Sequence, residues 1–289
     1  MPPVAVVTDT TAYLPADAVA ANGVELVSLY VNFGGERTER DADIRDYDAF
    51  YDDLRTAEAL PTTSQPSIGD FIEVYEPLLA DGRDVVSAHI SGGISGTVEA
   101  ARQAKEALER DGKGGERVHV VDSESSAGGL GLVTLAGARR AAAGGAAEEV
   151  VEHMRETRGQ LKMWFAVDTL EFLKRSGRIG AASAWIGSTL KIKPILTLEA
   201  EITPVERVRT STRAFERLVD YARQRHSSDA DAWVVQHIQA HDQAEALANR
   251  CREIFEREPV FCSEVGPVLG CHTGPGLLGV GSIPERFLA

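Results

Sequence analysis

The stretch His89-Ile-Ser-Gly-Gly-Ile-Ser-Gly-Thr97 connects an apolar run, Val85 to Ala88, to a segment with helical spacing, Val98 to Arg110. A strand, a loop of Gly and Ser, and then a helix place unpaired backbone N–H groups and hydroxyls at the helix N-terminus, where they can hold an anion. Ser91 and Ser95 add side-chain donors. This stretch therefore predicts an anion site, but by itself it does not identify the anion.

The first half of the chain alternates between short β-branched runs and helical segments. We expect strands at Val4–Thr8, Glu25–Phe33, Val85–Ala88 and Val118–Val121, and helices at Leu14–Asn22, Tyr47–Ala57, Ser67–Ala80, Val98–Arg110 and in an Ala-rich region that ends near Gly145. This alternation indicates βαβ units and a parallel sheet with a ligand at the carboxyl ends of its strands. Asp9 and Asp122 both follow such strands, and caps or turns explain them about as well as a direct site role.

The second half has a different pattern, which predicts a mixed sheet with helices on one face. The expected strands are Lys162–Val167, Pro194–Leu198, Ile202–Val208 and Trp233–Ile238, and the expected helices are 148–158, 181–190, 211–226 and 243–256. The tail Val260–Cys271 is strand-like and is followed by a stretch rich in Gly and Pro. We predict two α/β domains, residues 1–160 and 161–289, although no linker composition marks the boundary.

Composition narrows the class of protein. Of 289 residues, 43% are hydrophobic and 26% are charged, which is typical of a globular chain. The net charge of −14 argues against non-specific binding to nucleic acid. No apolar run is long enough to span a membrane, and no secretory signal is apparent, so we expect a cytoplasmic protein. The three cysteines lack the spacing of a disulfide framework or of a zinc site.

Basic residues are concentrated between Glu171 and His226, where eleven Lys and Arg stand against six Asp and Glu. Solvated helix faces explain most such clusters. The alternative interpretation is a docking surface for an acidic partner or a lipid head group, with Lys191, Lys193, Arg207 and Arg209 as its candidate residues.

Several chemical motifs are weak when each is taken alone. Gly93-Ile-Ser-Gly-Thr97 fails the G-x-S-x-G pattern of a serine hydrolase at its last position. The chain has neither G-x-G-x-x-G nor a P-loop, although the Ser/Gly loop could still hold a small phosphorylated metabolite. His237 and His241 are four residues apart, but Ile238 replaces the glutamate of H-E-x-x-H and the run reads as a strand, so ordinary surface or buried histidines are favoured over metal ligands.

Eight short motifs taken together resemble the DegV family, the bacterial fatty-acid-binding proteins that act as FakB-type subunits of fatty acid kinase. The similarity extends from about Val4 to Ile283. The motifs are Val7-Thr-Asp-Thr-Thr11, Pro61-Thr-Thr-Ser-Gln-Pro66, Ile90 to Thr97, Val121-Asp-Ser123, Leu170-Glu-Phe-Leu-Lys-Arg-Ser-Gly-Arg-Ile179, Leu190-Lys-Ile-Lys-Pro-Ile-Leu196, Val208-Arg-Thr210 and His272-Thr-Gly-Pro-Gly276.

The resemblance implies an N-terminal α/β/α domain with a parallel sheet and a C-terminal α/β domain with a mixed six-stranded sheet. It also implies a buried tunnel for one long-chain fatty acid and no other cofactor. The protein would not be a catalyst. It would present the acid to a separate ATP-dependent kinase of the FakA type, with transient membrane contact as a further expectation.

The resemblance assigns the fatty-acid carboxylate to hydroxyls and N–H groups of two loops. The residues that match these positions are Thr63, with Ser64 beside it, and Ser95, with Gly96 and Ser91 in the same loop; Arg178 and His272 match supporting positions near the head group. The chain departs from the common pattern at Ser91-Gly92-Gly93, where relatives often have Ser-Ser-Gly, and at Val98, where an aromatic residue is frequent.

Overall fold

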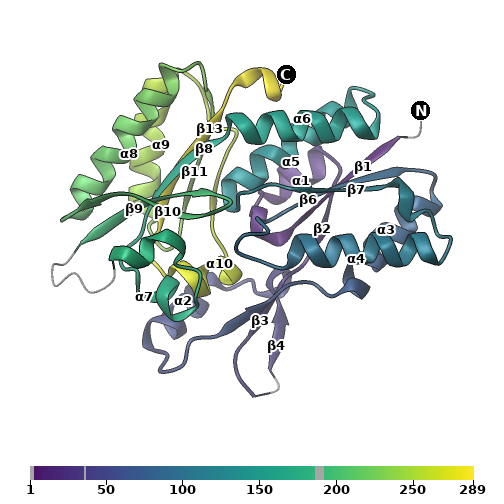
Figure 1. Cartoon of the computed structure of the whole chain (residues 1–289). Helices are drawn as coiled ribbons and strands as arrows, with labels where there is room; N and C mark the ends of the chain where they lie inside the picture. The colour runs from purple at the N-terminus through teal and green to yellow at the C-terminus, as the bar shows by residue number, and fades with distance from the viewer. Residues whose placement is uncertain (1–2, 36, 186–191) are drawn as a thin grey trace.

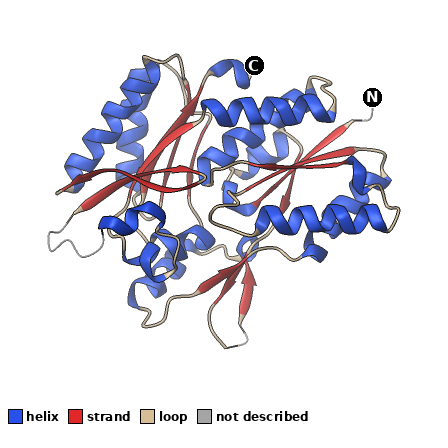
Figure 2. Cartoon of the chain, in the orientation of Figure 1, coloured by secondary structure: helices blue, strands red, loops and turns tan. Residues whose placement is uncertain are grey.

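The chain forms a four-stranded sheet, a six-stranded sheet and a small three-stranded sheet (Figures 1 and 2). The computed structural model describes residues 3–35, 37–185 and 192–289. The strands are β1 (Val4–Asp9), β2 (Val24–Val27), β3 (Tyr30–Asn32), β4 (Thr38–Arg40), β5 (Thr62–Ser64), β6 (Asp84–His89), β7 (Val118–Asp122), β8 (Lys162–Ala166), β9 (Lys193–Glu199), β10 (Glu201–Val208), β11 (Ala232–His237), β12 (Phe261–Glu264) and β13 (Leu278–Ile283).

The α-helices lie mainly between the strands in sequence. They are α1 (Ala16–Ala21), α2 (Tyr47–Thr56), α3 (Ile68–Ala80), α4 (Thr97–Arg110), α5 (Ala127–Ala142), α6 (Ala147–Gln160), α7 (Glu171–Arg175), α8 (Ser211–His226), α9 (His241–Phe255) and α10 (Pro267–Thr273). None of the helices in the described ranges is both long and apolar enough to cross a bilayer.

The first sheet has the order β2-β1-β6-β7, and all of its strand pairs are parallel. Helices α3 and α4 cover one face through Phe71, Tyr75 and Leu108, which belong to the same buried cluster as Val7 and Val85. Helices α5 and α6 cover the opposite face. The predicted α/β class with a parallel sheet is therefore confirmed, and the alternation of strand and helix is its physical cause.

The second sheet has the order β10-β9-β8-β13-β11-β12, with β11 and β12 parallel and the other pairs antiparallel. Helices α8 and α9 cover one face (Figure 1), as predicted, and α5 lies against the other. The predicted mixed six-stranded sheet is confirmed.

Helix α5 is shared by the two large sheets, and this explains its composition. Residues 127–138 are all buried, and their cluster joins strands of both sheets. Its glycines allow close approach: a Cβ at Gly131 would lie 2.7 Å from the ring of Phe261. A helix that packs between two sheets needs small residues on both of its packed faces. The Ala- and Gly-rich composition of this stretch is therefore explained by its position between the two sheets.

The single strand predicted at Glu25–Phe33 is wrong, because β2 and β3 belong to different sheets. The break falls at Ser28 and Leu29. The Ser28 hydroxyl donates to the Leu29 carbonyl and accepts from the Ala42 N–H, and the Leu29 N–H donates to the Thr10 hydroxyl. At these two residues such hydrogen bonds take the place of the backbone hydrogen bonds that would continue strand β2. The chain then enters the three-stranded antiparallel sheet β4-β3-β5.

The strand predicted at Val260–Cys271 is wrong after Glu264, because β12 ends there and α10 begins at Pro267. Strand β13 is a further element that the sequence did not predict. Strand β13 is fully buried near the middle of the mixed sheet, between β8 and β11. Its Gly279 and Gly281 weaken the usual strand signal. The segment 180–185 is a 3₁₀ helix, and the rest of the helix predicted at 181–190 lies outside the described residues. The other expected elements agree to within a few residues, while the boundary between residues 160 and 161, between α6 and β8, stays a prediction.

Candidate functional site

A single cavity brings together polar residues from distant parts of the chain. It contains about 1050 Å³ of space not filled by atoms, its open mouth included. Six of the seven candidate ligand residues line it: Thr63, Ser64, Ser95, Gly96, Arg178 and His272.

Thr63 and His272 form the best-defined polar contact at this cavity. Thr63 lies in β5, which pairs with β3, and His272 lies in the last turn of α10. The Thr63 hydroxyl and His272 Nε2 are 2.7 Å apart. His272 Nδ1 is buried and has no hydrogen-bond partner in the described part of the chain. When Thr63 donates to Nε2, Nδ1 carries a proton with no acceptor, which is costly for a buried group.

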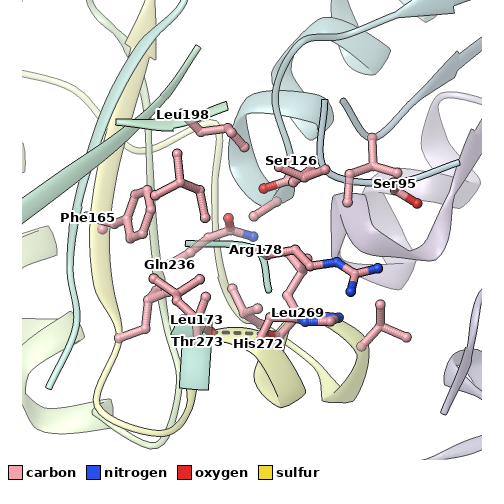
Figure 3. A pocket seen from close by; sticks show the side chains of 18 of the residues that line it. Ser95, Ser126, Phe165, Leu173, Arg178, Leu198, Gln236, Leu269, His272 and Thr273 are labelled. Carbon is pink, nitrogen blue, oxygen red and sulfur yellow. Dashed lines mark hydrogen bonds between the residues drawn. The ribbon is translucent and has the colours of Figure 1, made fainter. Parts of the chain in front are cut away.

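His272 is neutral near pH 7. Burial, assisted by the positive charge of Arg178, lowers the pKa of its imidazole to about 4. Arg178 itself is exposed, and its guanidinium donates to the Ser176 carbonyl at 2.7 Å. Figure 3 shows the polar ends of Ser95, Arg178 and His272 toward one side of the cavity and the apolar Phe165 and Leu198 toward the other. The site thus combines one fixed positive charge with neutral donors.

The loop before α4 supplies Ser95 and Gly96. The Ser95 hydroxyl is 2.9 Å from the Thr97 hydroxyl. A Cβ at Gly96 would lie 2.5 Å from Oε1 of Gln65, so any other residue here would displace the end of the Gln65 side chain, which belongs to the Pro61–Pro66 segment. Gln65, which also lines the cavity, is a site residue that we did not predict, although it lies inside a motif that we quoted.

Ser91 is not among the residues that line the cavity. Its side chain is buried, and its hydroxyl donates to the carbonyl of Ala200 at 2.6 Å, in the turn between β9 and β10. A Cβ at the neighbouring Gly93 would lie 2.4 Å from the same carbonyl oxygen. This part of the loop therefore connects the carboxyl end of β6 to the mixed sheet. Ser91 has this bridging contact in place of the expected ligand contact.

The interior of the cavity is apolar and is bounded by β8 and β13. Met163 and Phe165 of β8 pair with Gly281 and Gly279 of β13, and all four line the cavity. A Cβ at Gly279 would lie 3.0 Å from the Phe165 Cβ, and one at Gly281 would lie 2.9 Å from the Met163 Cβ, so the glycines make room for the large β8 side chains. Gln236 is a buried polar exception that the sequence did not reveal: its amide oxygen accepts from the Gly128 N–H, and its Nε2 donates to the Ser263 hydroxyl at 2.8 Å.

Asp9 supports the site indirectly. Its carboxylate accepts from the N–H and hydroxyl of Thr11, from the Ile90 N–H, and lies 3.0 Å from His89 Nδ1. The Asp122 carboxylate likewise accepts from the Gly92 N–H at 3.2 Å. Both aspartates therefore hold the Ser/Gly loop through its backbone, which is the turn-forming role that we weighed against a direct one.

The candidate docking residues are distributed along the β9–β10 hairpin. Lys193 Nζ lies 2.5 Å from an Asp168 carboxylate oxygen, so its charge is already paired. The Arg207 guanidinium stacks over the Trp185 ring at 5.2 Å, and Arg209 is exposed just after β10. Lys191 lies outside the described residues.

The fold and the site define an α/β protein with a parallel and a mixed sheet and a buried apolar cavity whose mouth is polar. The family model described as "Uncharacterised protein, DegV family" matches residues 3–285. The chain belongs to the DegV family, and the resemblance seen in the motifs is confirmed. It is 41% identical over 286 residues to a DegV domain-containing protein of Streptomyces coelicolor, covering 96% of this chain and 97% of that protein.

Solved structures of the family have the same architecture. One described as showing fatty acid binding of a DegV family protein from Thermus thermophilus superposes with a TM-score of 0.85 at 35% identity, covering 97% of this chain and 99% of that one. DegV of Bacillus subtilis, described as a fatty acid binding protein, gives a TM-score of 0.86 at 32% identity and covers 98% of this chain and 100% of that one.

Proposed function

We propose that this protein binds one long-chain fatty acid, with the acyl chain in the apolar interior and the carboxylate at the mouth. The observation that carries the proposal is the buried, unpaired Nδ1 of His272 beside Thr63, at the entrance of a cavity lined by Met163, Phe165 and Leu198. A carboxylate oxygen supplies the acceptor that Nδ1 lacks. The named fatty-acid-binding relatives support the same ligand class.

The energetics of such a complex are favourable. A sixteen-carbon acid buries roughly fourteen methylenes at ~0.8 kcal/mol each, or about 11 kcal/mol before the costs of immobilisation. A buried carboxylate needs donors, each of which contributes about 1.5–3 kcal/mol. His272 Nδ1–H and the Ser95 hydroxyl fill this role, aided by the nearby charge of Arg178. Thr63 acts through His272, because its hydroxyl donates to Nε2 and so keeps the ring proton on Nδ1. Chain burial supplies affinity, and the polar mouth fixes which end of the ligand faces outward.

Titration of delipidated protein with a long-chain acid and with its methyl ester tests this assignment by calorimetry. Thr63→Val removes the hydroxyl that keeps the proton on His272 Nδ1. It should therefore weaken acid binding about 10- to 100-fold, the equivalent of one lost bond from Nδ1–H to a charged acceptor, and should change ester binding much less. Thr62→Val is the matched control, since Thr62 neighbours Thr63 in β5 and does not line the cavity. Equal effects of Thr63→Val on acid and ester would place the carboxylate elsewhere.

We further propose that the bound acid is presented to a separate ATP-dependent fatty acid kinase, which transfers phosphate to the carboxylate. A carboxylate held at the mouth is the reactive end for such a partner, and Arg178, Arg207 and Arg209 offer exposed positive charge toward an acidic docking surface. The proposal places the protein in the cytoplasm, where ATP is available, as a carrier and not as the catalyst. In the described part of the chain the Ser95 hydroxyl bonds to Thr97 and not to a histidine, so a serine-hydrolase role gains no support.

A further inference from the structure

Titratable side chains outside the cavity converge at the edge of the mixed sheet formed by β11 and β12. These strands are parallel, and His237 and Glu264 are register partners at their carboxyl ends. Helix α9 begins at His241, directly after the turn that leaves β11. Parallel pairing therefore brings together three residues that the His-x-x-x-His spacing alone could not interpret, since His237 lies in a strand.

We propose that His237, His241 and Glu264 form a binding site for a divalent transition-metal ion of the zinc class. One ring nitrogen of each histidine and a carboxylate oxygen of Glu264 all lie within 4.8 Å of one another. His241 Nε2 and Glu264 Oε2 are 3.9 Å apart. Tetrahedral ligands at ~2.1 Å from a zinc ion are about 3.4 Å apart, so small side-chain rotations close the site.

The carboxylate is already oriented for this role. Its other oxygen, Oε1, accepts from the backbone N–H of Gln239 at 2.9 Å and from Gln239 Nε2 at 3.0 Å. Gln239 Nε2 also donates to Asp48 Oδ1 at 2.8 Å, and this bond connects the cluster to α2. Outer contacts of this kind hold a ligating carboxylate in place and leave its second oxygen available for an ion.

The chemistry of the donors selects the kind of ion. Two imidazoles and one carboxylate suit Zn²⁺, Co²⁺, Ni²⁺ or Cu²⁺, whereas Ca²⁺ and Mg²⁺ prefer oxygen ligands. The three side chains leave at least one coordination position for water. Glu264 also lines a surface groove that shares no lining residue with the apolar cavity, so an ion can reach it from solvent while the cavity is occupied.

The site is coupled to the cavity through neighbouring backbone. Val265, the residue after Glu264, lines the cavity, and its N–H donates to the His237 carbonyl at 2.8 Å. An ion held by His237 and Glu264 would therefore stiffen the β11–β12 edge beside the cavity wall. The three ligating side chains lie outside the cavity lining, so the ion site is present whichever ligand the cavity binds.

Calorimetric titration of tag-free, chelator-treated protein with Zn²⁺ tests the proposal, with the absorption spectrum of a Co²⁺ titration as a second readout. One ion per chain should bind to the unaltered protein. His241→Ala and Glu264→Gln should each weaken binding at least 10-fold and remove the Zn²⁺-dependent rise in melting temperature. Gln239→Leu should weaken binding without changing the stoichiometry.

Two control variants should bind Zn²⁺ like the unaltered protein. His226→Ala removes another exposed histidine, which pairs with Asp231 at 3.0 Å. Cys262→Ser removes the exposed thiol of β12. Absence of binding to the unaltered protein would overturn the proposal, as would binding that survives both His241→Ala and Glu264→Gln. Binding that is lost in Cys262→Ser would assign the ion to the thiol.

Discussion

His272 should make the ligand-free protein more sensitive to mild acid, and His272→Gln should remove this contribution. The folded protein holds the imidazole neutral, with a pKa of about 4, because the ring is buried and Arg178 is near. In the unfolded chain the pKa returns to ~6.5. Between these values the unfolded state binds a proton that the folded state does not, so folding stability falls as the pH is lowered.

The expected magnitude follows from the two pKa values. At pH 5.5 the linkage relation gives a loss of about 1.4 kcal/mol relative to pH 7.5. For a chain of this size each kcal/mol corresponds to roughly 2 °C in melting temperature, so the loss is about 3 °C. Burial raises the pKa of Asp41 to about 6, so this group makes folding stability rise, not fall, as the pH is lowered. Asp41 and the other titrating groups are common to both proteins and cancel in the comparison.

Differential scanning fluorimetry of delipidated protein at the two pH values measures this difference. Between pH 7.5 and 5.5 the unaltered protein should lose about 3 °C more than His272→Gln. Saturation with a long-chain acid should reduce the difference, because a carboxylate next to Nδ1 favours the protonated ring. Parallel losses in the two delipidated proteins would refute the assignment of a buried, neutral His272.

Three further predictions concern the loop and the docking surface. Ser95→Ala should lower acyl-phosphate formation by the partner kinase more than it lowers the lipid content of purified protein; a proportional loss of both would contradict a role in orienting the carboxylate. Gly93→Ala places a Cβ 2.4 Å from the Ala200 oxygen and should lower the melting temperature by several degrees, whereas Gly159→Ala, in open space on α6, should not. Arg209→Glu should slow kinase turnover or weaken binding to anionic vesicles with lipid uptake unchanged; if neither changes, Arg209 is not part of a docking surface.

The local sequence predicted those helices and strands in which apolar residues recur with a single helical or strand spacing from end to end. The parallel half is readable because its strands are short apolar runs between amphipathic helices. Strand β13 escaped prediction because Gly279 and Gly281 dilute its apolar pattern, although it is buried near the centre of the mixed sheet. The break between β2 and β3 depends on bonds from Ser28 to Ala42 and from Leu29 to Thr10, which no local window contains.

The candidate site was accessible mainly through the resemblance. Thr63 and His272 are 209 residues apart, and nothing in their local sequence indicates that they meet. The family motifs identified both. They could not reveal that Ser91 bonds to Ala200, or that Gln236 enters the cavity wall, because these contacts arise where the mixed sheet packs against the Ser/Gly loop and α5. The pairing of His237 with Glu264 likewise depends on strand register.

Mass spectrometry of an organic extract from denatured, purified protein tests the central claim most directly. We predict a long-chain carboxylic acid at one molecule per chain, whose length and saturation report the shape of the cavity. An extract without lipid, from protein that also fails to take up added fatty acid, would contradict the assignment of the cavity to an acyl chain.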